Sequence, residues 1–176
     1  MADIRARVEE DQGLLKKIQM FVPGFRGYRR KEDLRDADRM LRMQLSQKLG
    51  MQRRNLEESR MLITKTYGSK PLEMLGAIIS QFKKVEGAVT HAEMGYSGIS
   101  ADIQFKEDEL NRLYEYDAGL IGDVSVIAQS IEQLKVALAS QDDPKSLLAL
   151  ADIKGKITEF EDLFNRRMVV IEGTEV

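Results

Sequence analysis

Basic side chains recur along one face of residues 31–67 if this segment is helical. At about 100° per residue they fall within about 80° of arc, and the leucines of the segment lie roughly 90° away. A row of such side chains can bind nucleic-acid phosphates, anionic lipid headgroups or an acidic protein. The alternative is a solvated face, or a face that pairs with Asp36, Glu57 and the acidic C-terminal half of the chain. The stripe consists of Lys31, Arg35, Arg39, Arg42, Arg53 and Arg60.

A loop rich in glycine and arginine precedes this segment, with the sequence Pro-Gly-Phe-Arg-Gly-Tyr-Arg-Arg over residues 23–30. Aromatic and guanidinium groups on a tight loop can stack on a base, hold a phosphate or contact a protein. The alternative is a corner between two helices whose aromatic rings cap the core. The further candidates for binding a partner or an anion are Phe25, Arg26, Tyr28, Arg29 and Arg30.

The stretch from Val22 to Glu32, followed by Arg35-Asp36-Ala37-Asp38-Arg39, resembles a motif of small helical proteins of archaea and bacteria. This match covers about a tenth of the chain. The stretch Leu113-Tyr114-Glu115-Tyr116-Asp117 is similar to a second part of the same pattern. The resemblance implies a helical fold and no particular activity.

Two carboxylates interrupt the apolar faces of the predicted helices. Asp117 takes a core position in one helix, and Asp38 falls near the leucine face of another. A lone buried charge is costly, so each carboxylate needs a partner or contact with water. If the two C-terminal helices form a hairpin, Asp117 lies opposite residue 166. We therefore predict a structural ion pair of Asp117 with Arg166 or Arg167; an acid–base or metal-binding role is the alternative.

The chain offers few residues for catalysis or metal binding. It has no Cys and one His, which excludes thiolate nucleophiles, disulfides, Cys-zinc sites and iron–sulfur clusters. Three residues before His91 stands Ala88, where a di-iron bundle needs Glu. No nucleophile elbow or phosphate-binding loop is present in the sequence. We therefore expect no catalytic residue, no metal ion and no cofactor.

The hydrophobic periodicity that must position these residues is helical almost throughout. Residues 107–139 keep a seam like that of a coiled coil. Residues 99–105 alternate with period two, and because a single strand has no partner we interpret them as an extended connector or a frayed turn. Short connections favour antiparallel neighbours, which predicts an all-α, elongated, up-and-down antiparallel bundle forming one domain over residues 1–176. The helical segments are 3–20, 31–67, 71–92, 107–139 and 144–171.

Turn-forming residues separate these segments. Pro23-Gly24 suits a type II turn, in which Gly24 supplies the positive φ. Before the last helix we expect Asp143 to be the cap and Pro144 to take the first helical position.

Composition and charge set the class of protein. The chain has 176 residues, of which 43% are hydrophobic and 32% charged, as in a folded, charge-rich domain. The net charge of -2 divides into a balance of +7 over residues 1–70 and -9 over residues 71–176. The two halves neutralise each other, or one of them faces an oppositely charged partner. The chain lacks Cys, a bilayer-spanning apolar segment and the apolar core of a signal peptide, so we expect it in the cytoplasm.

These features predict a non-enzymatic helical adaptor, scaffold or assembly protein that acts through its surface. We expect a protein partner, and the seams could also serve a homo-oligomer. The alternative is an anion-binding module that uses the basic face of residues 24–60 on nucleic acid or an anionic membrane surface.

Overall fold

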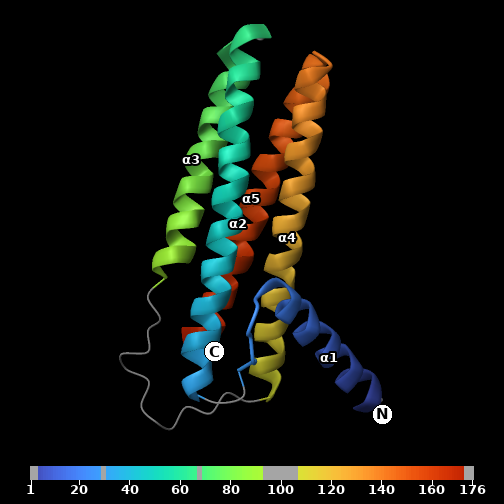
Figure 1. Ribbon diagram of the computed structural model, residues 1–176, viewed down its shortest axis with the longest axis vertical. Helices are drawn as coiled ribbons and strands as arrows, with labels where there is room; N and C mark the ends of the chain where they lie inside the picture. The colour runs from blue at the N-terminus through green and yellow to red at the C-terminus, as the bar shows by residue number, and fades with distance from the viewer. Residues whose placement is uncertain (1–3, 29–30, 67–68, 93–106, 173–176) are drawn as a thin grey trace.

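The computed structural model describes residues 4–28, 31–66, 69–92 and 107–172, which form five α-helices (Figure 1). No strand occurs among these residues, so the predicted all-α class is confirmed. The segment 99–105, interpreted as a connector, lies outside the described residues. The helices are α1 (Ile4–Phe21), α2 (Lys31–Thr66), α3 (Ser69–His91), α4 (Glu107–Ala139) and α5 (Asp143–Glu172).

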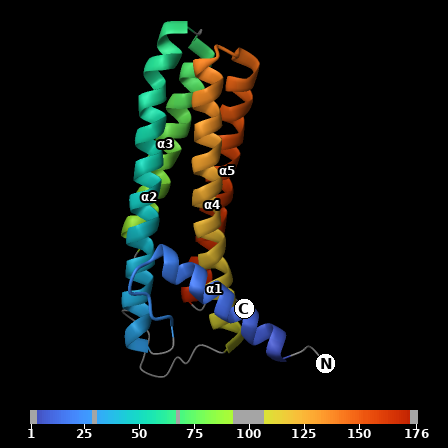
Figure 2. The ribbon, with the colours of Figure 1, turned by 45° about the vertical axis from the view of Figure 1, so that its right-hand side comes forward.

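Helices α2 to α5 form the elongated bundle that the periodicity predicts. Helices α2 and α3 make one antiparallel hairpin, and α4 and α5 make the other (Figure 1). The hairpins lie side by side with their turns at the same end (Figure 2), so α2 runs parallel to α4 and α3 runs parallel to α5. Helix α1 lies outside these four and crosses α4 obliquely.

The apolar stripes face the core as predicted. Helix α4 buries a broader stripe than its seam alone, because it contacts α1, α2 and α5; Ile121, Ser130 and Ala137 are buried beside the seam. None of the described helices is both long and apolar enough to cross a membrane. The buried stripe of α2 is Leu34, Leu41, Leu45, Leu49, Leu56 and Ile63.

The corner between α1 and α2 starts with the predicted turn. The Phe25 N–H donates a 3.1 Å hydrogen bond to the carbonyl of Val22, which closes a four-residue turn around Pro23 and Gly24. Gly24 has a φ of 84°, the positive value that this turn requires. The type of turn could be predicted because proline and glycine restrict the backbone locally.

The corner between α4 and α5 corrects the predicted cap. The N–H groups of Gln141 and Asp142 donate to the carbonyls of Leu138 (3.2 Å) and Ala137 (3.0 Å), which is a Schellman motif. Asp142 then caps α5, since its Oδ1 accepts a 3.0 Å hydrogen bond from the Lys145 N–H. The prediction of Asp143 as the cap is wrong by one residue, because this residue already lies inside α5.

Candidate functional site

Four polar side chains from distant parts of the chain meet in the core. They are Tyr28 from the α1–α2 corner, Asp38 from α2, Asp117 from α4 and Arg167 from α5, and we call them the buried charge cluster. All four are buried. Asp38 lies near the start of α2 and Arg167 near the end of α5, so the cluster lies in the half of the bundle away from the two hairpin turns.

Arg167 is the centre of the buried charge cluster. Its Nε lies 2.5 Å from Asp117 Oδ1, and its Nη1 lies 2.6 Å from Asp38 Oδ1. Its Nη2 donates a 3.1 Å hydrogen bond to the Tyr28 hydroxyl, and this hydroxyl donates to Asp117 Oδ2. One guanidinium group therefore connects the corner and helices α2, α4 and α5.

Arg42 extends these interactions toward the surface. Its Nε lies 2.7 Å from Asp38 Oδ2, while its Nη1 donates 3.2 Å hydrogen bonds to the carbonyls of Val89 and Thr90. These carbonyls belong to the last turn of α3, where a helix presents unsatisfied acceptors and partial negative charge. Arg42 therefore caps α3 and also balances the second carboxylate of the cluster.

Glycine and a second tyrosine position Tyr28. Gly27 has a φ of 88°, and a Cβ at this residue would lie 2.6 Å from the Tyr114 hydroxyl oxygen. This hydroxyl accepts a 2.9 Å hydrogen bond from the Tyr28 N–H. The Tyr28 ring lies between those of Tyr114 and Phe25, with centroid separations of 5.2 and 5.3 Å. A side chain at residue 27 would separate the corner from α4.

Burial determines the proton equilibria of the cluster. It raises the pKa of Tyr28 well above its ordinary value, and the neighbouring charge of Asp117 raises this pKa further. Burial also raises the pKa of Asp117, while the charge of Arg167 and the Tyr28 hydroxyl oppose this shift. Burial acts to lower the pKa of Arg167, but its interactions with Asp117, Tyr28 and Asp38 together outweigh this effect, and the pKa lies well above its usual value. The Arg167 side chain is therefore a permanent cation and Tyr28 a neutral hydrogen-bond donor.

The expected pairing of Asp117 forms with Arg167, while Arg166 is exposed. The sequence did not predict that Tyr28 and Asp38 join Asp117 around the same guanidinium group. One signal was available, because Asp38 and Arg42 are four residues apart on one helix, the spacing of an ion pair. No signal pointed to the Tyr28 hydroxyl, whose partners lie 89 and 139 residues away.

The predicted arginine stripe divides into exposed and paired members. Arg35, Arg39 and Arg60 are exposed on α2, and Arg26 is exposed in the corner. Arg53 contacts Glu57 and Glu86, each at 2.9 Å, and Arg42 is engaged by Asp38. Arg29 and Arg30 lie outside the described residues, and so does the side chain of Lys31. The paired alternative therefore holds for Arg42 and Arg53.

The prediction that Phe25 and Tyr28 present their rings to a partner is wrong. Both side chains are buried, because the corner folds back onto α4 and places them against the core. The alternative interpretation, a corner whose aromatic rings cap the bundle, describes their position.

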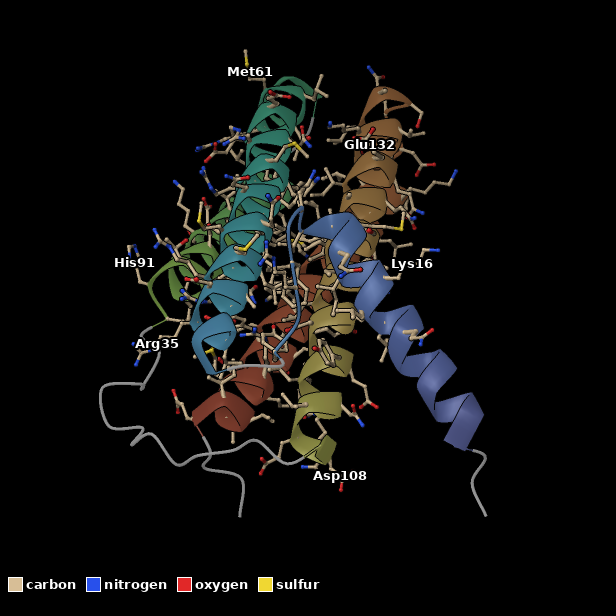
Figure 3. The ribbon with its side chains drawn as sticks, turned by 60° about the horizontal axis from the view of Figure 1, so that its bottom comes forward. Lys16, Arg35, Met61, His91, Asp108 and Glu132 are labelled. Atoms are coloured by element: carbon tan, nitrogen blue, oxygen red, sulfur yellow. The ribbon has the colours of Figure 1, made fainter. Side chains whose placement is uncertain are left out.

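His91 is exposed at the end of α3 (Figure 3), as is Arg35 near the start of α2. Among the described residues, no group of three or more His, Asp or Glu side chains could hold a metal ion.

A surface hollow of about 590 Å³ lies between α4 and α5 near their turn, and we call it the α4–α5 hollow. Small side chains form its walls, namely Ala137, Ser140 and Ala149. Val136 and Leu148 stand beside them with 68% and 70% of their surface exposed. Charged side chains complete the lining, which are Glu132, Lys145 and Asp152. Figure 3 places Glu132 toward the hairpin-turn end of the bundle.

Comparison of the chain with protein-family models, curated proteins and solved structures finds no match. The resemblance in the stretch from Val22 to Glu32 therefore stays a prediction, and function must be argued from the geometry.

Proposed function

We propose that this chain is a non-enzymatic helical adaptor or assembly protein that acts by binding other protein chains through its surface. The α4–α5 hollow carries the proposal. Two branched apolar side chains, Val136 and Leu148, stand largely in solvent beside a concavity of small residues. Scattered apolar side chains are ordinary on a protein surface, but an apolar pair beside a hollow is typical of an interface.

The buried charge cluster supports the same proposal, because its polar groups are closed to a substrate. Asp38, Asp117 and Arg167 have no exposed surface, and they bond to one another and to Tyr28. Groups so enclosed have no face left for a substrate. Their contribution is to hold the helices in place, and the exposed surfaces then carry the binding.

Cross-linking in cells that produce the protein, followed by mass spectrometry, tests the proposal. We expect the wild-type chain and a Met20→Glu control to cross-link to the same protein chains. The variant Val136→Glu/Leu148→Glu should lose these cross-links. Met20 is 80% exposed on α1, outside the hollow, so it controls for the loss of an exposed apolar side chain. Cross-links that are identical in all three proteins would contradict the proposal.

A second candidate function is the binding of a polyanion on α2. The exposed positions of Arg26, Arg39 and Arg60 favour it. The replacement Arg39→Glu/Arg60→Glu tests it without disturbing Arg42, which caps α3. Polyanion binding predicts that RNA, DNA or anionic vesicles bind the wild type at low salt, that salt weakens this binding steeply, and that the variant loses it. Absence of binding at low salt would eliminate this function.

A further inference from the structure

Helix α4 carries a second, outward-facing stripe beside the α4–α5 hollow. Residues 118–140 contain only three charged side chains, Asp123, Glu132 and Lys135, in a chain that is 32% charged. The exposed residues of the stripe alternate at spacings of three and four, the repeat that packs one helix against another. The stripe is Val126, Gln129, Gln133, Val136 and Ser140.

From this stripe and the hollow we propose that the α4–α5 face binds a second copy of this chain about a twofold axis perpendicular to both helices. The proposal rests on the proposed function and names the partner. In a twofold contact the same patch of the two copies meets, so this patch must contain both members of each interacting pair. Here an exposed leucine, Leu148, stands next to the small residue Ala149.

The twofold axis brings these complementary groups together. It reverses the order of residues along α5, so that Leu148 of each copy lies over Ala149 of the other. The same operation brings Lys145 of each copy opposite Asp152 of the other. Lys145 is exposed and its Nζ lies 3.0 Å from Asp142, while Asp152 accepts a 2.5 Å hydrogen bond from Ser130.

The charges of the hollow favour a second copy as its occupant, because the reversed arrangement pairs Lys145 with Asp152. The lining of the hollow contains charges of both signs: Glu132 and Asp152 are negative, and Lys145 is positive. A mixed patch is complementary to itself when it is reversed. The exposed arginines of α2 lack this property, because they share one sign and would repel in a contact between two copies.

The face is small for an interface between two protein chains. Residues 124–140 of α4 span about 25 Å, and two adjacent helices are about 20 Å wide. The contact therefore buries about 500 Å² on each copy, at the lower end for a specific interface. We expect a dimer that dissociates on dilution.

Sedimentation equilibrium of the purified full chain over a wide range of concentrations tests the proposal. We expect the mass of the wild type and of Met20→Glu to rise toward twice that of the chain, and Val136→Glu/Leu148→Glu to remain a monomer. Both replaced side chains are exposed, so we expect this variant to fold, and thermal unfolding verifies that it does. A wild type that stays monomeric, or a dimer that persists in the folded variant, overturns the proposal.

Reversed charges test the orientation. Lys145→Glu should weaken the dimer about tenfold, because it sets two like charges against each other. Lys145→Glu/Asp152→Lys should restore it, and absence of this rescue overturns the twofold arrangement. If the purified chain is monomeric while cross-links in cells still depend on Val136 and Leu148, the adaptor function stands and its partner is a different protein.

Discussion

The two halves of the bundle are stabilised in different ways. Near the hairpin turns the buried side chains of the described residues are uncharged and mostly apolar, with Leu56, Ile131, Leu150 and Ile153 fully buried. In the other half, the same four helices enclose charge, and Arg167 connects three of them to the α1–α2 corner. Helix α1 and its corner pack on this charged half (Figure 2).

The two halves of the bundle contribute differently to the fold. Apolar packing stabilises any arrangement of side chains that fills the core. A guanidinium group, in contrast, donates its hydrogen bonds only to acceptors at particular angles and distances. A buried ion pair adds little net stability over an apolar replacement, but loss of one partner leaves an uncompensated charge. We therefore expect the charged half to fix how the corner and the helices align, and the apolar half to contribute most of the stability.

The largest expected effect is that of Arg167→Met. It leaves Asp38 and Asp117 buried without their shared partner, and loss of one member of a buried ion pair costs about 3–5 kcal/mol. Chemical denaturation measures the loss in the free energy of unfolding.

Replacement of the three charged residues of the cluster together tests whether unpaired charge causes this loss of stability. Asp38→Leu/Asp117→Leu/Arg167→Met removes both signs together, and we expect it to recover most of the stability that Arg167→Met loses. Arg42 would keep its hydrogen bonds to the carbonyls of Val89 and Thr90. If the triple variant is as unstable as the single one, unpaired charge is not the cause of the loss.

In the apolar half, Leu150→Ala should cost about 2–5 kcal/mol, because it creates a cavity around a fully buried position. The loss should be nearly the same at neutral and alkaline pH, because the change removes no titratable group. A loss that depends strongly on pH would show that the two halves are coupled.

Tyr28→Phe should cost about 1–3 kcal/mol at neutral pH, because Asp117 Oδ2 loses a buried donor. The wild type should also lose stability in alkali. The pKa of Tyr28 is raised above 10.0 in the folded state, so its contribution is complete below this pH and falls as the pH rises above it, where the unfolded chain releases the proton.

Denaturation at neutral pH and above pH 10.0 measures this dependence. The alkaline loss should be smaller in Tyr28→Phe, with Leu150→Ala as the control that retains it. Equal alkaline losses in the wild type and Tyr28→Phe would contradict the assignment.

The smallest expected effect is at the α4–α5 corner. Gln141 has a φ of 55°, which glycine adopts without the steric cost of a Cβ. Gln141→Gly should stabilise the protein by a few tenths of a kcal/mol up to about 1 kcal/mol, and thermal unfolding measures the change. Gln129→Gly, inside α4, is the control and should destabilise by about 1 kcal/mol.

Much of the fold could be predicted because it is local. The leucine spacing of α2 and the seam of α4 follow from helical periodicity, and the turn at Gly24 follows from the backbone limits of proline and glycine. The pairing of Asp117 could be predicted as well, because one hairpin fixes the register of α5 against α4. Each of these inferences needs only neighbours along the chain or one reversal of direction.

The burial of Phe25 and Tyr28 could not be predicted in this way. Their placement depends on how the α1–α2 corner packs on α4, where Gly27 meets the Tyr114 hydroxyl 87 residues further along the chain. The hollow beside Val136 and Leu148 could not be predicted either, since each of these residues taken alone is an ordinary apolar residue of a helix.

The bundle of long helices and the pairing of Asp117 with an arginine could both be inferred from the residues alone. Helical periodicity and the cost of burying a charge are properties of the local chain and of one hairpin. The packing of several helices was needed to show that one arginine pairs with two carboxylates and a tyrosine, and that Val136 and Leu148 stand exposed beside a hollow between α4 and α5. These features depend on the relative placement of several helices, which the spacing of residues along the chain does not encode.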